Sequence, residues 1–202
     1  MKYTAFLLFL VIGFCQNQKS IAKEEFKSSN YDAVSEQALK YCVKNNLQKN
    51  YYMLVDLNVH SGKKRFYIYD FNKDSIVKSY MVSHGCGDNK WSSTFTKDNP
   101  KISNEFDSHC SSVGKYIIGE RGSSQWGIRV KYLLKGKDKT NSNALERAIV
   151  LHSWEEIPDD EVYPKGTPEG WGCPAVSNAA MKEIDAKLKK SVKPVLLWVI
   201  KS

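Results

Sequence analysis

A cysteine and a histidine of the kind that form catalytic pairs lie 21 positions apart in the last third of the chain. His152 follows the apolar run at residues 148–151, and Cys173 follows the glycine-rich segment 170–172. A thiol is a useful nucleophile when a neighbouring base takes its proton, and a strand end holds such a base rigidly. A tight glycine turn leaves backbone N–H groups free to bind an oxyanion. Two interpretations stay open from these residues alone: a cysteine nucleophile with its histidine base, or a structural histidine with a buried packing thiol.

A second group of nitrogen and sulfur side chains lies upstream, at His84, Cys86, His109 and Cys110. Imidazole and thiolate are zinc ligands, so a metal site is the alternative to consider. The spacing matches no common zinc module, and neighbours such as residues 109 and 110 point to opposite sides of an extended chain. We therefore expect no metal. His60 falls in a predicted turn and is expected to be a solvated surface residue.

The cysteines leave one disulfide open. Four remain after residue 22: Cys42, Cys86, Cys110 and Cys173. An oxidising compartment permits bridges. Cys173 is needed as a thiol, and Cys42 falls on the apolar side of a predicted helix. A bridge between Cys86 and Cys110 remains an alternative to two free thiols, because pairing does not follow from sequence.

The elements that must hold these residues are mostly strands. Alternating and β-branched runs predict strands at residues 52–57, 65–70, 76–82, 115–119, 127–132, 147–152 and 194–200. Helical spacing predicts a helix at 33–45, with Asp32 as its cap, and another at 178–190, with Ser177 as its cap. The loop from Gly85 to Cys110 is long and polar, so we expect it to shape the substrate cleft. The result is a mainly β domain with flanking α-helices.

The N-terminal segment has the layout of a signal peptide, with Lys2 before an apolar run and a polar stretch after it. The run is shorter than the roughly twenty residues that a permanent membrane span requires. We expect cleavage after Ala22 and export to the periplasm or cell envelope. Lipidation of Cys15 is the competing interpretation, which the bulky Phe14 disfavours. The predicted organisation is a signal peptide at 1–22, a polar leader and helix at 23–50, and a catalytic domain at 51–202.

The charge of the chain is moderately positive. Two of its 30 Lys and Arg residues and none of its 22 Asp and Glu residues lie in segment 1–22, which leaves 28 basic and 22 acidic residues, a net charge of +6. Such an excess keeps an exported protein close to an anionic polymer or surface. No basic stripe interleaved with aromatic residues is present, so we expect no nucleic-acid partner.

Several short segments, taken together and in order, resemble a known family. They are residues 82–85 (VSHG), 103–104 (SN), 111–116 (SSVGKY), 141–144 (NSNA), 147–153 (RAIVLHS) and 170–176 (GWGCPAV). They look like the motifs of YkuD-type murein L,D-transpeptidases, and more closely those of the exported subgroup. The resemblance runs from about residue 52 to the C-terminus. Ordered motifs of this kind are far more specific than one histidine and one cysteine.

The resemblance implies a β-sandwich-like catalytic domain that acts on peptidoglycan stem peptides without a metal or cofactor. By this likeness Cys173 attacks the third stem residue and releases the terminal D-alanine through a thioester. His152 is the general base and then the acid, oriented by the Ser153 carbonyl. The backbone N–H groups of Gly172 and Cys173 bind the oxyanion. An amine acceptor makes the enzyme an L,D-transpeptidase, and water makes it an L,D-carboxypeptidase.

The likeness also implies substrate-binding positions and contains two departures. His84, Asn104, Ser112 and Trp171 match subgroup positions that would line the substrate site. The wider family usually has Ser or Thr where this chain has Gly170, and often Arg where it has Ala175. These departures favour the alternative of an inactive wall-binding module with the same fold. A papain-like peptidase fits poorly, because there the cysteine precedes its histidine.

Overall fold

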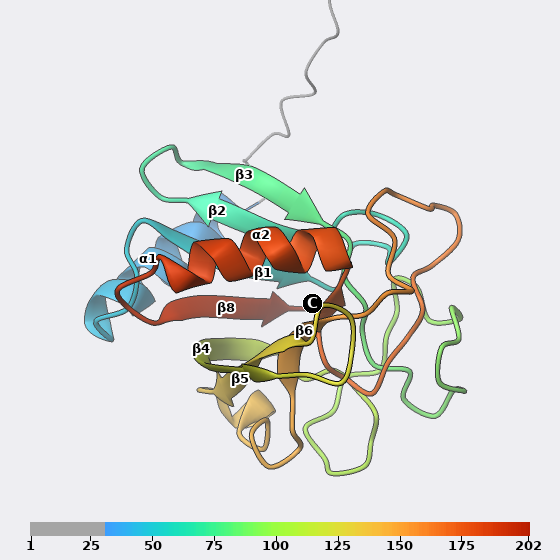
Figure 1. Ribbon diagram of the computed structural model, residues 1–202. Coiled ribbons are helices and arrows are strands. Elements are labelled where there is room, and N and C mark those ends of the chain that lie inside the picture. Colours follow the sequence, from blue (N-terminus) through green and yellow to red (C-terminus); the bar gives the residue numbers. More distant parts are fainter. Residues whose placement is uncertain (1–30) are drawn as a thin grey trace, which may run out of the picture.

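The computed structural model describes residues 31–202. The expected signal peptide at 1–22, its cleavage site, Cys15 and most of the polar leader lie outside the described residues. Two α-helices, one short 3₁₀ helix and eight strands follow one another within the described part (Figure 1). Their bounds are α1 Asp32–Lys44, β1 Tyr51–Asp56, β2 Phe66–Asp70, β3 Ser75–Tyr80, β4 Gly114–Ser123, β5 Val130–Gly136, η2 Lys139–Asn141, β6 Val150–Ser153, β7 Ala175–Val176, α2 Asn178–Lys189 and β8 Val195–Ile200.

The eight strands form one strongly bent sheet in the order β3-β2-β1-β8-β4-β5-β6-β7. Its two ends approach each other just beyond β3, where the Ser83 N–H donates to the Ala175 carbonyl in β7 over 2.8 Å. This contact makes the sheet barrel-like, which satisfies edge groups that an open sheet would expose. The mainly β fold class with flanking helices is confirmed.

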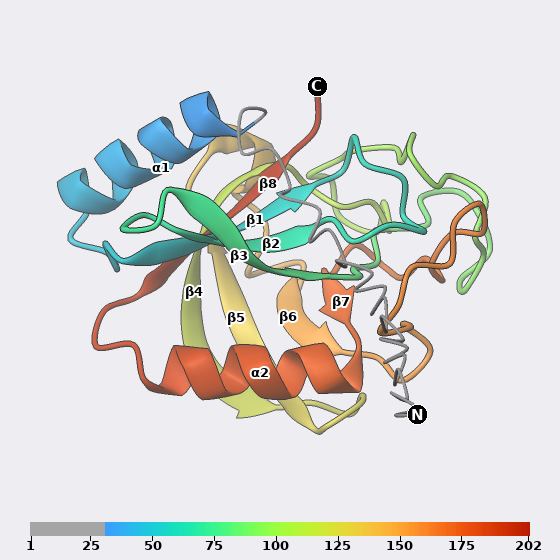
Figure 2. The same ribbon diagram turned by 90° about the horizontal axis from the view of Figure 1, so that it is seen from above.

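The two helices cover opposite faces of the central strands (Figure 2). Along β1, Tyr51, Met53 and Val55 belong to the core under α2, whereas Tyr52 and Leu54 belong to the core under α1. Successive side chains of a strand point to opposite faces, so a strand buried on both faces is apolar throughout. The uninterrupted apolar run of β1 has this cause.

The predicted helices form, with one difference at a cap. The Ser177 side chain accepts a hydrogen bond from the Ala180 N–H at 3.1 Å, as predicted for the start of α2. The prediction of Asp32 as the cap of α1 is wrong. Tyr31 occupies that position without a capping hydrogen bond, and Asp32 is the first helical residue. A carboxylate in the first turn still interacts favourably with the helix dipole.

Two predicted strands are displaced along the chain. The strand expected at 127–132 is β5, which begins at Val130 because Gly127 and Arg129 adopt positive φ in a turn. The strand expected at 147–152 begins at Val150, because Ala148 also has a positive φ of 55°. Both turns stand at the entrance to strands that border the candidate site. Backbone conformations of this kind leave little trace in side-chain periodicity.

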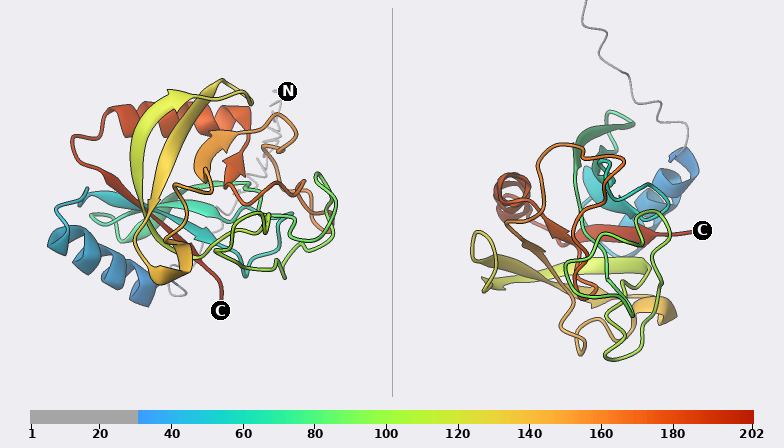
Figure 3. Two further views of the ribbon diagram at one scale, coloured as in Figure 1. Left: turned by 90° about the horizontal axis from the view of Figure 1, so that it is seen from below. Right: turned by 90° about the vertical axis from the view of Figure 1, so that its right-hand side faces the viewer.

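The two longest loops, at residues 81–113 and 154–174, gather at one end of the sheet (Figure 3). In the right-hand view of Figure 3, this end faces the viewer. Backbone hydrogen bonds join the two loops, including Cys86 N–H to Gly170 O at 2.7 Å and Gly170 N–H to His84 O at 2.8 Å.

Within residues 31–202, no helix is both long and apolar enough to cross a bilayer.

Candidate active site

The fold brings His152 and Cys173 to one pocket. His152 lies in β6, and it pairs with Ala175 in β7, two residues after Cys173. The Val150 N–H points to the Cys173 sulfur at 3.4 Å. Both side chains line a pocket of about 450 Å³. Within the described residues, the two side chains are not hydrogen-bonded to each other. In enzymes without bound substrate, hydrogen bonds between catalytic groups are often long and shorten only when substrate binds.

The contact of the His152 ring determines which nitrogen carries the proton. Its Nδ1 lies 2.9 Å from the Ser153 carbonyl oxygen, which can only accept a hydrogen bond. Nδ1 is therefore the protonated nitrogen, and the lone pair is on Nε2. Burial lowers the pKa of His152, while the Ser153 carbonyl and Glu155 oppose that shift. The ring is consequently neutral near pH 7 and able to accept a proton.

The groups around the Cys173 thiol have opposite effects on its pKa. Burial raises the pKa of Cys173, whereas the Val150 N–H, Arg147 and Lys131 favour the thiolate. Because burial dominates, the thiol holds its proton in the resting state. A protonated thiol can act as a nucleophile only when a base takes its proton.

The turn before the cysteine requires glycine at one position. Gly172 has a φ of +97°, and a Cβ added there would lie 2.3 Å from the Cys110 carbonyl oxygen. Within residues 31–202, the backbone N–H groups of Gly172 and Cys173 have no hydrogen-bond acceptor. Two unpaired N–H groups beside a nucleophile are the arrangement that an oxyanion needs.

Ser83 fixes the segment that carries the cysteine. Its hydroxyl donates to the Cys173 carbonyl at 3.4 Å and accepts from the Ala175 N–H at 3.1 Å. Its own N–H donates to the Ala175 carbonyl. Ser83 thus holds both sides of Pro174. The sequence contained a signal for it, since Ser83 precedes His84 in an upstream motif.

A cluster of tryptophans forms one wall of the pocket, and sequence reasoning missed it. Trp91 stacks on Trp154 with ring centroids 5.0 Å apart, and Trp126 lies 6.0 Å from the first and 6.2 Å from the second. All three line the pocket with His152 and Cys173. They come from three separate segments, so no spacing along the chain links them.

The four residues expected to bind substrate have different placements. Trp171 is 62% exposed, stacks on His109 and lines the pocket. His84 and Ser112 are buried. The Asn104 side chain is hydrogen-bonded to the turn at residues 139–143. Of the four, only Trp171 is brought to the pocket.

Arg147 anchors the loop at residues 81–113, which carries three of these four residues. Its guanidinium donates to the Ser103 carbonyl at 3.0 Å and to the Cys110 carbonyl at 2.7 Å. The Cys110 carbonyl is also the atom that faces Gly172. Residues of the upstream motifs therefore support the turn at residues 170–173.

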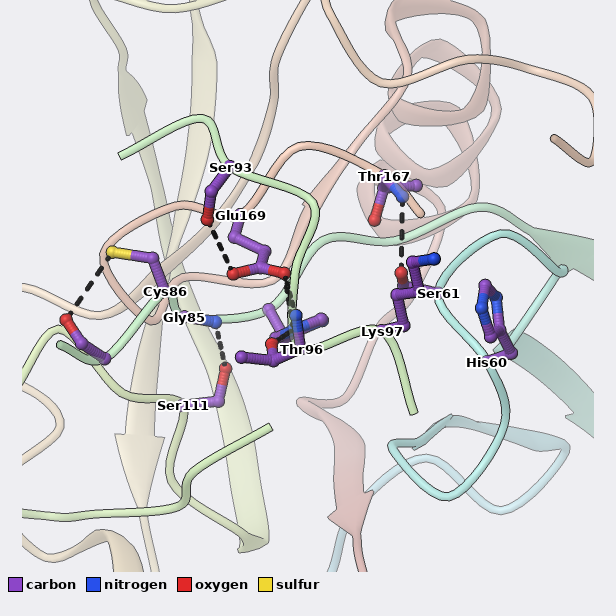
Figure 4. A network of polar contacts seen from close by, with 12 residues as sticks. His60, Ser61, Gly85, Cys86, Ser93, Thr96, Lys97, Ser111, Thr167 and Glu169 are labelled. Carbon is purple, nitrogen blue, oxygen red and sulfur yellow. Dashed lines mark hydrogen bonds and ion pairs between the residues drawn. The ribbon is translucent and has the colours of Figure 1, made fainter. Parts of the chain in front are cut away.

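A buried polar network holds the other side of that turn (Figure 4). Glu169, fully buried, accepts hydrogen bonds from the Thr96 N–H at 2.7 Å and the Ser93 hydroxyl at 3.0 Å. His84 lies between Arg65 and Thr96, with each of its ring nitrogens 2.6 Å from one of them. Arginine has no lone pair to offer, so His84 Nδ1 accepts from Arg65 and Nε2–H donates to Thr96. The His84–Glu169 approach of 3.7 Å is therefore not a true ion pair, because the ring is neutral.

Acidification should destabilise the fold through His84. Burial and Arg65 lower its pKa well below the ordinary value, so the unfolded chain takes up this proton at a higher pH than the folded chain. The contribution of neutral His84 to the free energy of unfolding is fully present above pH 6.5. It is lost as the pH falls, by up to about 1.4 kcal/mol per pH unit for one proton. Urea unfolding at pH 7.5, 6 and 5 measures this slope. His84→Gln should show a smaller slope, and an equal slope in the variant would contradict the assignment.

The four described cysteines are free thiols, so no Cys86–Cys110 bridge is formed in this structure. Both residues are buried, and the chain segments that carry them run side by side, with Gly87 N–H donating to His109 O at 3.2 Å. His84 is not available as a zinc ligand, because its two ring nitrogens are hydrogen-bonded to Arg65 and Thr96. No group of three or more metal-ligating side chains is found in residues 31–202.

The two family departures have different surroundings. Ala175 is buried against Met81, Trp154 and Ile157, so an arginine side chain would have no space there. No atom lies within 4 Å of a Cβ added at Gly170.

Gly170→Ser should therefore fold normally, because its hydroxyl would enter open space in the pocket. We expect a melting temperature within about 2 °C of the parent. Differential scanning calorimetry checks this expectation. A larger decrease would mean that the backbone at residue 170 needs glycine for its conformation.

Comparison with known proteins gives the following matches. Among solved structures, the chain is similar to Bd1075 of Bdellovibrio bacteriovorus, with 18% identity and a TM-score of 0.41 over 77% of this chain and 49% of that one. It is similar to residues 123–326 of an L,D-transpeptidase from Xylanimonas cellulosilytica, with 13% identity and a TM-score of 0.40 over 80% and 68%. The helical cell shape determining protein Pgp2 from Campylobacter jejuni has 14% identity and a TM-score of 0.41 over 76% and 49%.

The chain spans about half the length of the Bdellovibrio and Campylobacter proteins. No curated protein matches the sequence. A family model described as the L,D-transpeptidase catalytic domain matches residues 23–196, which is most of the chain. The protein belongs to the family of L,D-transpeptidase catalytic domains.

Proposed function

We propose that this chain is a cysteine acyl transferase of peptidoglycan tetrapeptide stems, with Cys173 as nucleophile and His152 as base. The observation that carries the proposal is the shared pocket of the two side chains, together with the Ser153 contact that leaves His152 Nε2 free for a proton. The unpaired N–H groups of Gly172 and Cys173 supply an oxyanion site at the same turn.

In the first half-reaction the Cys173 sulfur attacks the carbonyl carbon of the third stem residue. His152 Nε2 takes the thiol proton, and the carbonyl oxygen becomes an oxyanion bound by the turn. When the tetrahedral intermediate collapses, the C–N bond to the terminal D-alanine breaks. His152 returns the proton to the departing amine, and a thioester remains on Cys173.

In the second half-reaction the thioester is resolved by an acceptor. A stem amine attacks the same carbonyl carbon, His152 removes the amine proton, and the C–S bond breaks to release a cross-linked product. Water in place of the amine gives a tripeptide and makes the enzyme an L,D-carboxypeptidase. The chemistry needs no metal or cofactor.

We further propose that the protein acts outside the cytosol, in the periplasm or cell envelope. The support is the signal-like layout of residues 1–22 and the moderately positive charge of the remaining chain. Expression of the full chain with and without that segment, followed by cell fractionation, tests this part.

The test of the activity is mass spectrometry of tetrapeptide muropeptides incubated with the protein under reducing conditions. We expect loss of D-alanine, with or without a new cross-link, and no reaction with Cys173→Ala. A folded parent protein that leaves stems of the correct type unchanged would refute the activity. It would favour a wall-binding module with the same fold.

A further inference from the structure

Cys86 and Cys110 are two buried thiols that neither the proposed reaction nor the apolar core uses. Their exposed fractions are 2% and 0%. A buried free cysteine usually packs as a small apolar side chain, as Cys42 does in the core under α1. Cys86 and Cys110 belong to none of the three apolar clusters within residues 31–202. Packing in a core therefore does not account for them.

The two sulfurs lie against the same residue, Gly87. The Cys86 sulfur is 3.7 Å from the Gly87 carbonyl oxygen, and a Cβ added at Gly87 would lie 3.4 Å from the Cys110 sulfur. The Gly87 N–H donates to the His109 carbonyl over 3.2 Å, so the peptide bond after Cys86 is hydrogen-bonded to the peptide bond before Cys110. Adjacent backbone of this kind suits a disulfide, whose Cα atoms lie within about 7 Å of each other.

Both cysteines contact the turn at residues 170–173 through their backbone. The Cys86 N–H donates to the Gly170 carbonyl at 2.7 Å. The Cys110 carbonyl oxygen faces Gly172, where it would lie 2.3 Å from an added Cβ. The two thiols thus belong to the two chain segments on which this turn rests.

The Ser111 hydroxyl links the same two segments to the turn without a covalent bond. It accepts a hydrogen bond from the Gly85 N–H at 3.0 Å (Figure 4) and donates one to the Gly172 carbonyl at 3.2 Å. The segment of Cys86 and the segment of Cys110 therefore meet under the turn. A covalent bond between them would fix the support of the turn.

Neither buried thiol reaches the candidate active site. Cys173 and His152 line two pockets, one beside the tryptophan cluster and one beside the turn between β4 and β5. Cys86 and Cys110 line neither of them. A bond between Cys86 and Cys110 would therefore leave the Cys173 thiol free to react.

We propose that Cys86 and Cys110 are a site of disulfide formation, closed by thiol–disulfide exchange with a small disulfide oxidant in an oxidising compartment. The free thiols of this structure are the reduced form of the pair. The oxidised form clamps the two segments under the turn and does not consume Cys173. The inference concerns the fold of the turn and does not depend on the acyl-transfer reaction.

The exchange starts at Cys110. Burial raises the pKa of both thiols, but Ser108 and Lys101 oppose this shift at Cys110, whereas Glu169 adds to it at Cys86. The Cys110 thiolate attacks one sulfur of the oxidant, and the S–S bond of the oxidant breaks to release a thiolate. The Cys86 thiolate then attacks the Cys110 sulfur and displaces the second thiolate. The two protons of the protein thiols go to the released thiolates, and the oxidant gains the two electrons that the protein loses.

The test is oxidative refolding followed by mapping of the cysteines. Because both sulfurs are buried, exchange needs the surrounding loops to be open, so the reduced protein is refolded from urea with and without oxidised glutathione. Free thiols are then alkylated, and the protein is digested with trypsin without reduction. The four described cysteines fall in four different tryptic peptides, at residues 41–44, 79–90, 102–115 and 166–182. Mass spectrometry should find peptide 79–90 linked to peptide 102–115, with the other two peptides alkylated.

The second measurement is thermal unfolding of the oxidised and the reduced protein. The bond should raise the melting temperature by about 5–10 °C, because it closes the chain segment between Cys86 and Cys110, and dithiothreitol should reverse this increase. Cys86→Ala and Cys110→Ala should each abolish the increase. Cys42→Ala, the matched substitution of a buried thiol in another core, should keep it. The comparison of the parent protein before and after reduction needs no substitution, so it decides the matter even where a variant fails to fold.

The inference is overturned if Cys86 and Cys110 are both alkylated after oxidative refolding, or if either of them is linked to Cys42 or Cys173. It is also overturned if the linked protein unfolds at the temperature of the reduced protein, since a clamp must stabilise the fold. None of these measurements uses peptidoglycan. Failure of the proposed function is seen separately, as an absence of D-alanine release.

Discussion

His152→Gln should lower the rate of D-alanine release by about a thousandfold, within the range that general-base catalysis supplies. Glutamine is similar in size, and its amide can still donate to the Ser153 carbonyl that the His152 ring contacts. It cannot accept the thiol proton, and burial keeps the Cys173 thiol protonated. The measurement is single-turnover formation of the thioester, followed by mass spectrometry of the intact protein.

His60→Gln is the matched control for this variant. His60 lies in a turn, where its Nδ1 accepts from the Gly62 N–H and its ring packs on Tyr163, so it contacts neither pocket that holds Cys173. The control should react at the parental rate. A His152→Gln protein with parental activity would transfer the base role to another group.

The pH profile of kcat/KM provides an independent check of His152. Burial lowers its pKa, so the acid limb should inflect below the usual histidine value of about 6.5. The base is then fully deprotonated at neutral pH, and activity should be flat above the inflection. The acid limb should disappear in His152→Gln. An inflection above pH 7 would mean that a nearby carboxylate has a larger effect than burial on the pKa of His152.

Gly172→Ala should abolish most activity and destabilise the fold. The residue has a φ of +97°, and its new Cβ would lie 2.3 Å from the Cys110 carbonyl oxygen. Strain and overpacking of this kind cost about 2–4 kcal/mol together. The backbone must shift, and the shift moves the N–H groups of Gly172 and Cys173, so we expect at least a hundredfold loss of rate.

Gly170→Ala separates this effect from a general intolerance of the turn. Gly170 is two residues away in the same segment, with no positive φ and no atom within 4 Å of an added Cβ. Gly170→Ala should unfold at the parental temperature, and its Cys173 thiol should be alkylated at the parental rate. Thermal unfolding and the rate of Cys173 alkylation by iodoacetamide, measured on both variants, make the comparison. Equal behaviour of the two variants would refute the steric argument.

Residues of the upstream motifs that resembled substrate contacts are buried or hydrogen-bonded beneath the turn at residues 170–173. His84 helps to fix the loop at Thr96, which Glu169 holds from the other side, and Arg147 binds the Cys110 carbonyl under Gly172. A single sequence shows that such residues stand in a motif, but not whether they touch the ligand or the residues behind it. Burial decides between the two, and burial of a polar residue depends on partners from distant segments.

The sequence alone was sufficient to predict the family of this protein and most of its elements. His152 and Cys173 could be singled out as candidates because a histidine at a strand end and a thiol in a glycine turn are local patterns. The apolar run of β1 and the helical spacing of α2 are local as well. Strand starts at Val130 and Val150 were misplaced because turns with positive φ precede them. Only the tertiary structure assembled the tryptophan cluster, since Trp91, Trp126 and Trp154 come from three separate segments. Contacts between distant segments follow from how the chain packs, and side-chain spacing along one sequence does not encode them.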